Sequence, residues 1–185
     1  MFPSCVTDEY CEIPSCIASI CAFDPLIPPD ADLTGTQINS TQPIAVFGGH
    51  EEARVGEGCC AEHLEQRLLP VSNWGTHYLA ARAEPRGRSR EHWRIIAERE
   101  ETIVETTLEA PALQRFTLNR GEFREIITEQ SFEVSASSPV LVAQYLVSQD
   151  GTTMELVDPA LIITPPTSQL WRSYQLITPG GYNQN

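Results

Sequence analysis

The chain is similar to itself at a spacing of 96 residues. Seven pairs of like residues share this register without a gap: Ile38 with Val134, Pro43 with Pro139, Ile44 with Val140, Val46 with Val142, Pro70 with Pro166, Ser72 with Ser168 and Tyr78 with Tyr174. One such pair could arise by chance, but seven in one register indicate a duplicated unit. The sequence therefore predicts a first unit over residues 32–128 and a second, incomplete unit over residues 129–185, within a longer repetitive protein.

The apolar pattern within these units is typical of short β-strands. Residues 93–97, 102–108 and 123–128 each carry β-forming side chains, and Asn119–Glu122 between them reads as a hairpin turn. Phe132, Val134 and Ala136 alternate with polar residues, as in a half-buried strand. With 14 prolines and 11 glycines, the chain is predicted to be all-β, built from tandem antiparallel β repeats in a sandwich or propeller-like arrangement.

Two segments qualify this expectation. Residues 140–147 are apolar at nearly every position, which indicates a strand that is covered on both faces. Residues 61–69 are the only stretch compatible with a helix, and Pro70 would end it. They are predicted to form either one or two helical turns or an extended loop.

The cysteines are concentrated at the start of the chain. The six are Cys5, Cys11, Cys16, Cys21, Cys59 and Cys60. Four of them fall within residues 1–31, a segment that closes with three prolines as a stiff linker. An even number of cysteines so clustered is typical of a disulfide framework in an oxidising compartment. The first 21 residues lack the features of a signal peptide, so we expect the export signal to lie upstream of Met1 and the protein to be extracellular or on the cell surface.

Charge excludes several classes of partner. The formal net charge is −13, which opposes binding to nucleic acid and to anionic lipid. Five arginines between residues 82 and 94 form the one basic cluster, and glutamates, a proline and a glycine interrupt it. No stretch approaches the ~20 apolar residues that a membrane-spanning helix needs, so no membrane insertion is expected.

A central run of the sequence carries a resemblance to a known family. It contains Gly48-Gly49-His50, then Cys59-Cys60-Ala61-Glu62-His63-Leu64-Glu65-Gln66, then Leu69-Pro70-Val71-Ser72-Asn73-Trp74-Gly75-Thr76. Read physically, Trp74-Gly75-Thr76 is a tight corner in which the indole buries a large face. The run resembles the N-terminal domain of the IgGFc-binding protein family, over about residues 32–185. The resemblance nominates structural or binding residues, namely His50, His63, Glu65, Gln66, Trp74, Gly75 and Thr76.

The chain also departs from the pattern of the family it resembles. A cysteine commonly follows the Gly-His there, whereas Glu51 stands at that position here, so a local disulfide is expected to be lost. Arg67 displaces the spacing between Gln66 and Pro70. Residues 1–31 do not look like the β-rich portion that normally precedes the motif, and they are predicted to be a different module to which Cys59 or Cys60 is bridged.

The resemblance implies a non-catalytic extracellular binding or adhesion module of a larger secreted or surface protein, with protein or glycan partners and no cofactor. Immunoglobulin binding itself is not carried over, because no contact residues for it can be identified. The sequence has no Gly-x-Ser-x-Gly elbow, phosphate-binding loop or His-Glu-x-x-His motif, so no enzyme activity is expected.

Three further hypotheses stay open. His50, Cys59, Cys60 and His63 are suitable residue types for zinc, although adjacent cysteines rarely chelate one ion. A fragment of a carbohydrate-active enzyme is a weaker alternative; Trp171 could stack on a sugar, whereas Trp74 and Trp93 are expected to pack in a corner or core. Finally, an incomplete second unit would leave its strands from Val140 onward without partners, and weak self-association through that edge is predicted.

Overall fold

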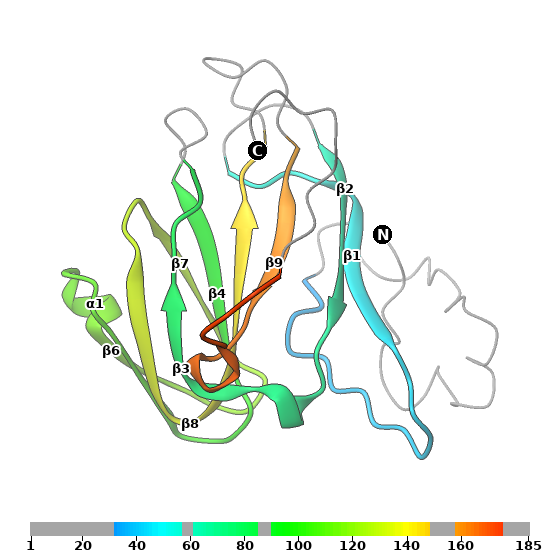
Figure 1. The fold of residues 1–185 in the computed structure, drawn as a ribbon, viewed down its shortest axis with the longest axis horizontal. Coiled ribbons are helices and arrows are strands. Elements are labelled where there is room, and N and C mark those ends of the chain that lie inside the picture. The colour runs from blue at the N-terminus through cyan, green and yellow to red at the C-terminus, as the bar shows by residue number, and fades with distance from the viewer. Residues whose placement is uncertain (1–31, 57–60, 85–89, 149–157, 176–185) are drawn as a thin grey trace.

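The computed structural model describes residues 32–56, 61–84, 90–148 and 158–175, and these fold almost entirely as antiparallel β structure (Figure 1). The strands in this part of the chain are β1 (Val46–Ala53), β2 (Glu62–Leu68), β3 (Gly75–Ala80), β4 (Glu91–Ala97), β5 (Thr102–Thr106), β6 (Arg115–Leu118), β7 (Phe123–Thr128), β8 (Phe132–Leu146) and β9 (Ala160–Thr164). Short turns of helix complete it: α1 (Pro111–Gln114) and the 3-10 turns η2 (Val71–Asn73) and η3 (Thr167–Gln169). The prediction of an all-β chain is confirmed for these residues. The Cys-rich segment 1–31 and Cys59 and Cys60 lie outside them.

Strand β8 is the centre of the fold, because it pairs along both of its edges. Its first half pairs with β3 on one edge and with β5 on the other. Its second half pairs with β9 and with β4. Since Val140 lies opposite both Gly75 and Ala97, β3 and β4 occupy opposite edges of β8. The sheet thus runs in the order β6-β5-β8-β4-β7, with β3 and β9 added beside β8.

A change of direction within β8 lets this sheet fold over itself. Pro139 lies in the middle of the strand and has no N–H to give to the ladder; its carbonyl instead accepts the N–H of Glu98. The register of β3 against β8 shifts in the same region. Figure 1 shows the strands of this sheet curling over one another into one body. A strand that bends from one layer into another in this way is typical of orthogonal sheet packing.

The interior of this body is filled by large apolar side chains from both halves of the sheet. The largest are Tyr78, Trp93, Ile95, Ile126 and Val140, each exposing 1% of its surface or less. Trp93 packs edge-on against Phe132, with ring centroids 5.4 Å apart and planes at 77°. The expectation that Trp93 belongs to the core is confirmed. These contacts join β4, which lies against the second half of β8, to the start of β8.

One polar pair is buried beside this core. Gln144, the single polar residue in the apolar run of β8, donates from its amide to the carboxylate of Glu91 at the start of β4. The other carboxylate oxygen of Glu91 accepts the N–H of Ala83, at 2.9 Å. A buried polar group is tolerated when its hydrogen bonds are made, so this pair fastens the 81–83 corner to β8.

The hairpin of β1 and β2 lies beside the body, next to β9 (Figure 1). Val55 and Leu64 from the hairpin region bury themselves against Val147, with Tyr145 and Leu161 packed around them. Val55 also exchanges backbone hydrogen bonds with Ser148: its carbonyl accepts the Ser148 N–H, and its N–H donates to the Ser148 hydroxyl. Among the described residues, β1 has no strand partner other than β2.

The structure differs from the sequence-based expectations in two places. Residues 62–68 form the strand β2 instead of a helix or loop, because pairing with β1 satisfies their backbone and buries Leu64. The strands from Val140 onward do not lack partners. From Val140 onward, β8 pairs with β4, a strand of the first predicted unit, on one edge and with β9 on the other. The boundary predicted at residues 128 and 129 falls between β7 and β8, which are two strands of one sheet.

The predicted turn at residues 119–122 is confirmed. The Glu122 N–H donates to the Asn119 carbonyl at 3.0 Å, and the Glu122 carboxylate accepts the Asn119 N–H at 2.7 Å. Gly121 takes a positive φ of 77°, which favours glycine. The turn packs against Gly35, where an added Cβ would overlap the Gly121 carbonyl, so both glycines are needed for this contact.

Two neighbouring isoleucines of β7 provide a matched test of the core. Ile126 exposes 1% of its surface and Ile127 exposes 39%. We expect Ile126→Ala to lower the free energy of unfolding by about 2–5 kcal/mol, because it leaves a cavity. Ile127→Ala should lower it by about 1 kcal/mol or less, since little apolar area is lost. Urea unfolding followed by circular dichroism measures both; equal losses for the two variants would contradict the described packing.

Candidate functional site

The two histidines that the sequence nominates lie on the β1–β2 hairpin. His50 is opposite Leu64 in the ladder, so its side chain shares a face with that buried leucine. His63 precedes Leu64 and, by the alternation of a strand, points to the other face, where its Nε2 lies 3.3 Å from a carboxylate oxygen of Glu65. The His50 Nδ1 accepts the Glu52 N–H at 3.0 Å. The hairpin therefore directs the two imidazoles to opposite faces.

This arrangement bears on the zinc hypothesis. A tetrahedral zinc site needs all four ligands around one point. Two imidazoles on opposite faces of one hairpin do not meet this requirement while the two strands remain paired. No group of three or more potential metal ligands occurs among the residues that the structure describes. Cys59 and Cys60, which the hypothesis requires, lie outside those residues.

The Trp-Gly-Thr run forms the corner that leads from β2 to β3. The Trp74 indole N–H donates to the Leu69 carbonyl at 3.2 Å, which closes the corner around η2. The Gly75 N–H donates at 2.8 Å to the hydroxyl of Tyr78, and this hydroxyl donates in turn to the Val140 carbonyl of β8. A Cβ on Gly75 would overlap the ring of Pro166, so only glycine fits there.

The other nominated residues make local contacts. Gln66 donates to the carbonyl of the next residue, Arg67, at 3.5 Å. The Thr76 hydroxyl lies 2.9 Å from the Nδ1 of His77. The nominated residues are thus not gathered around one cavity. They lie along a hairpin and the corner that follows it.

A second corner, 96 residues further on, repeats the hydrogen bonds of the first. In the first corner, three backbone N–H groups donate: Asn73 to the Pro70 carbonyl (2.8 Å), Trp74 to the Val71 carbonyl (3.0 Å) and Gly75 to the Tyr78 hydroxyl (2.8 Å). In the second corner, the corresponding N–H groups donate in the same way: Gln169 to the Pro166 carbonyl (2.9 Å), Leu170 to the Thr167 carbonyl (3.2 Å) and Trp171 to the Tyr174 hydroxyl (2.8 Å). The two corners touch, since the Gln169 amide donates to the Asn73 carbonyl at 2.8 Å.

The hairpins that precede the two corners also share a register. In the first hairpin, Val46 lies opposite Leu68 and His50 opposite Leu64. Adding 96 to each number gives Val142 opposite Thr164 and Leu146 opposite Ala160, which are the pairs found between β8 and β9. Each of the five pairs from Val46 to His50 has its counterpart in this way.

The surroundings of the two corners differ. Tyr78 exposes 1% of its surface, because β8 covers it, whereas Tyr174 exposes 60%. Trp171 stands where the first corner has Gly75, and it exposes 77%. Trp74 and Trp93 are not among the exposed large apolar residues, so Trp171 is the tryptophan that the described structure presents to solvent.

The paired tyrosines provide a test of the corner geometry. Tyr78→Phe removes the hydroxyl that joins Gly75 to Val140 and leaves two polar groups unsatisfied beside the core, so the free energy of unfolding should fall by about 1–3 kcal/mol. Tyr174→Phe removes the same local bond at an exposed site and should change it by at most about 0.5 kcal/mol. Chemical unfolding measures both variants. A loss for Tyr174→Phe as large as that for Tyr78→Phe would show that the hydroxyl bridge to β8 is not the source of stability.

An arginine anchors the start of the described chain to the body. The Arg94 guanidinium lies 2.8 Å from the Asp32 carboxylate and donates to the Thr34 hydroxyl at 2.8 Å. It also stacks over the rings of Phe123 and Tyr145, at 4.7 Å and 5.3 Å from their centroids. In the sequence, Arg94 belongs to the interrupted basic cluster of residues 82–94; its aromatic partners come from distant strands, so no local pattern could reveal this contact.

The anchor gives Asp32 a perturbed acidity. Burial raises the pKa of its carboxyl, but hydrogen bonds from Thr34 and the charge of Arg94 outweigh burial, so the pKa lies below its ordinary value of 3.8. A carboxyl whose pKa is lowered by folding stabilises the folded state above its unfolded pKa, and this stabilisation is lost as pH falls through the folded pKa. The anchor should therefore be complete at neutral pH and open only in strong acid.

This predicts a specific titration. The Thr34 amide, which donates to the Asp32 carboxylate at 3.0 Å, should shift in an NMR titration with a midpoint below 3.8, the ordinary value for Asp32. Arg94→Gln should move that midpoint upward, because the favourable charge is removed. A midpoint at or above the ordinary value in the unmodified protein, or no movement in the Arg94 variant, would contradict the anchor.

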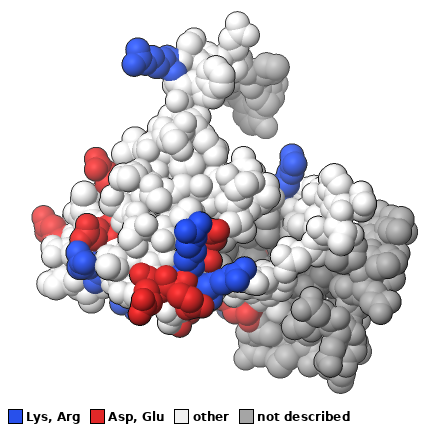
Figure 2. All heavy atoms as spheres, turned by 90° about the horizontal axis from the view of Figure 1, so that it is seen from below, with Lys and Arg blue, Asp and Glu red and all other residues white. Residues whose placement is uncertain are grey.

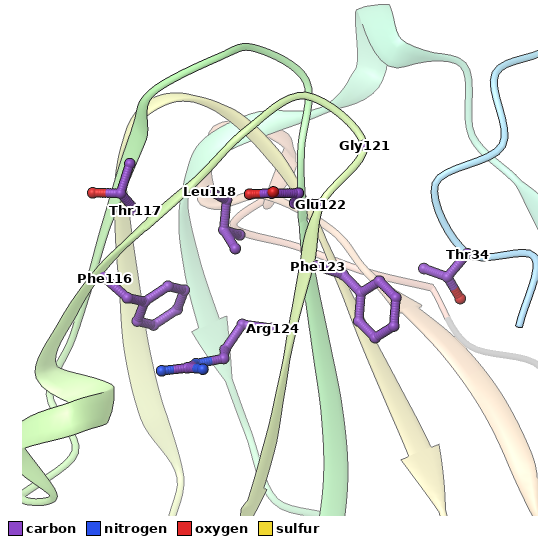
Figure 3. Close-up of a pocket in the computed structure, with 8 residues that line it drawn as sticks. All are labelled: Thr34, Phe116, Thr117, Leu118, Gly121, Glu122, Phe123 and Arg124. Carbon is purple, nitrogen blue, oxygen red and sulfur yellow. The ribbon is translucent and has the colours of Figure 1, made fainter.

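A shallow pocket of about 480 Å³ opens beside the 119–122 turn (Figure 3). Its lining residues are Thr34, Phe116, Thr117, Leu118, Gly121, Glu122, Phe123 and Arg124. The Arg124 guanidinium stacks on the Phe116 ring, 5.4 Å from its centroid, and the Glu122 carboxylate is engaged by the turn. The lining contains no imidazole or thiol, and both of its charged groups have structural partners.

Charges of both signs meet on the surface. Figure 2 shows acidic and arginine side chains side by side on one face, where no separate basic patch is seen. Ion pairs among the described residues include Arg99 with Glu98, at 3.4 Å, and Arg115 with Glu105. Exposed pairs of this kind contribute little stability. On the face shown in Figure 2, the two signs of charge are interspersed, so the electrostatic field has no single sign there.

The fold and these contacts define a β-rich module whose most distinctive sequence motif builds a corner of the scaffold. The chain matches the model of a family described as IgGFc binding protein over residues 21–185, and it belongs to that family. The human IgGFc-binding protein is 42% identical to it over 48 residues, which are 26% of this chain and 1% of that protein. The chain thus spans a very small part of this relative's length. No solved structure shows significant similarity to it.

The family match begins at residue 21, earlier than the resemblance of the motif indicates. Part of the predicted Cys-rich segment therefore belongs to the matched region. No helix among the described residues is long and apolar enough to cross a membrane.

Proposed function

We propose that this chain is a non-catalytic binding module that acts outside the cell and holds a protein ligand on a rigid β scaffold. The observation that carries this proposal is membership of the IgGFc-binding family across residues 21–185. The contacts of the motif support it. Trp74, Gly75 and Tyr78 are used to build a corner, so the scaffold is what the motif maintains and the ligand surface lies elsewhere.

The scaffold is suited to recognition. Strand β8 pairs along its two edges with four strands of the sheet, β3, β4, β5 and β9, so the loops at the ends of the sheet are held by a packed core. Rigid strands that present loops are a common basis for binding surfaces. The ligand that the name of the human relative indicates is the Fc region of immunoglobulin G, and Fc is therefore the first ligand to test.

We further propose that the chain is built from tandem units related by 96 residues. The matched registers of the β1–β2 and β8–β9 hairpins and the matched hydrogen bonds of the two corners support this. The body consists of β3–β7, which belong to the first proposed unit, and of β8 and β9, which belong to the second. On this proposal, each body takes its last two strands from the unit that follows. The hairpin β1–β2 corresponds to β8–β9, so it would complete a different body from the one that contains β3–β7.

The cysteines remain part of the proposal. In an oxidising compartment, Cys5, Cys11, Cys16, Cys21, Cys59 and Cys60 would form disulfides, which stabilise small extracellular modules by constraining the unfolded chain. This is compatible with a surface or secreted location.

Binding to immobilised Fc, with Fab from the same antibody as the matched control, tests the proposed ligand. We expect saturable binding to Fc and none to Fab, measured by biolayer interferometry on the oxidised, monomeric protein. Deglycosylated Fc should bind equally well if the ligand is protein. Binding lost with the glycan would instead favour the glycan alternative.

The negative outcomes are also informative. A chain that binds neither Fc nor any member of a mucosal protein panel, but binds a glycan array, would overturn the protein-ligand proposal. Reproducible hydrolysis of a glycan by purified protein, abolished by one carboxylate substitution, would overturn the non-catalytic assignment.

A further inference from the structure

Residues 170–175, which follow η3, form an exposed aromatic segment without a strand partner among the described residues. Trp171 and Tyr174 expose 77% and 60% of their surfaces, and Leu170 is also exposed. By the 96-residue correspondence, Trp171 to Gln175 match Gly75 to Leu79 of β3. That strand does have a partner: it pairs with the first half of β8.

Near the start of the described chain lies a segment that matches this first half of β8. Residues 36–44 correspond to residues 132–140, with Ile38 at the position of Val134 and Ile44 at that of Val140. In β8 these two valines are fully buried, exposing 2% and 0%. Ile38 and Ile44 expose 37% and 52%, and residues 36–44 contain no strand. Among the described residues, both segments of this type of strand pair are therefore present, and neither has a strand partner.

We propose that residues 171–175 of one molecule pair with residues 36–44 of a second copy, as β3 pairs with β8, and that copies thereby associate head to tail. The register follows from Gly75 opposite Val140 and Tyr78 opposite Val134. Trp171 lies opposite the partner's Ile44, and Tyr174 lies opposite the partner's Ile38. The inference rests on the tandem units proposed above.

The Tyr174 hydroxyl supplies the hydrogen bond that selects this register. It already accepts the Trp171 N–H at 2.8 Å, as the Tyr78 hydroxyl accepts the Gly75 N–H. The Tyr78 hydroxyl then donates to the Val140 carbonyl. In the head-to-tail pair, the Tyr174 hydroxyl donates to the carbonyl of the partner's Ile44. Strand addition of this kind uses the backbone for affinity and alternate side chains for specificity.

Two features make the association weak. In the first corner, Pro166 packs directly on Gly75. Trp171 stands at the position of that glycine, and the partner's Pro70 corresponds to Pro166. The larger side chain of Trp171 therefore keeps the partner's Pro70 farther away. The bend held by the Ser40 hydroxyl, which donates to the Gln42 carbonyl at 2.6 Å, must also open. With so small an interface we expect a Kd of roughly 10⁻⁴ M. The net charge of −13 on each copy predicts tighter association at higher salt.

The interface is heterologous, since residues 171–175 of one copy meet a different segment, residues 36–44, of the other. Contacts of this type form open chains of molecules unless a rotation closes them into a ring. If residues 36–44 are blocked in one copy and residues 171–175 in another, one contact between the two copies can still form. The mixture can therefore form a dimer that does not grow further. An interface that uses the same surface on both copies cannot behave in this way.

Sedimentation velocity of the full chain, at increasing concentration, tests the proposal. Wild-type protein should sediment faster as concentration rises. Ile44→Asp, which blocks the segment 36–44, and Trp171→Asp, which blocks the segment 171–175, should each remain monomeric alone, and their equimolar mixture should give a dimer and nothing larger. Ile162→Asp, on an exposed apolar residue of β9, is the matched control and should behave as wild type.

Several outcomes would overturn the inference. They are a wild-type chain that stays monomeric, a mixture of the two blocked variants that stays monomeric while the wild type associates, loss of association in the Ile162 control, or loss of association on addition of a reductant. The Fc measurement is made below the association range, so a failure there concerns the ligand alone, and a failure here leaves the ligand proposal intact.

Discussion

The structure depends on β8 being paired along both edges over two different halves. Its first half lies between β3 and β5 and its second half between β9 and β4. Both halves contribute buried valines to one core, and the change of direction around Pro139 allows the two layers to enclose it. Any loss of that strand would open both layers, since the core residues of β3, β4 and β5 face side chains that β8 carries.

The hydroxyl of Tyr78 links this central strand to the corner that begins the body. It accepts from Gly75 and donates to Val140, so the direction in which β3 starts is set by β8, which is far away in sequence. The second corner has the same local hydrogen bond at Tyr174 but no strand over it in the described chain. Identical local chemistry thus gives a buried, stabilising contact in one place and an exposed aromatic surface in the other.

This contrast connects the scaffold to its proposed role. The family motif keeps the corner in shape, and on the function proposed above the ligand binds to exposed loops and segments. Membership of the IgGFc-binding family makes a protein ligand the first one to test. A module that also joins copies through strand pairing would present that ligand surface repeatedly, which raises the effective concentration of binding sites without any new contact.

The sequence by itself determined the all-β class, the turn at residues 119–122, the core position of Trp93 and the family, because these follow from local periodicity, turn chemistry and a specific run of residues. Tertiary structure alone decided that residues 62–68 are a strand, since they pair with β1, and that β8 is completed by β3, β4, β5 and β9. It also decided that Arg94, stacked on two aromatic rings, forms an ion pair with Asp32, and that His50 and His63 point to opposite faces. Each of these depends on which distant segments meet, and a linear pattern does not contain that information.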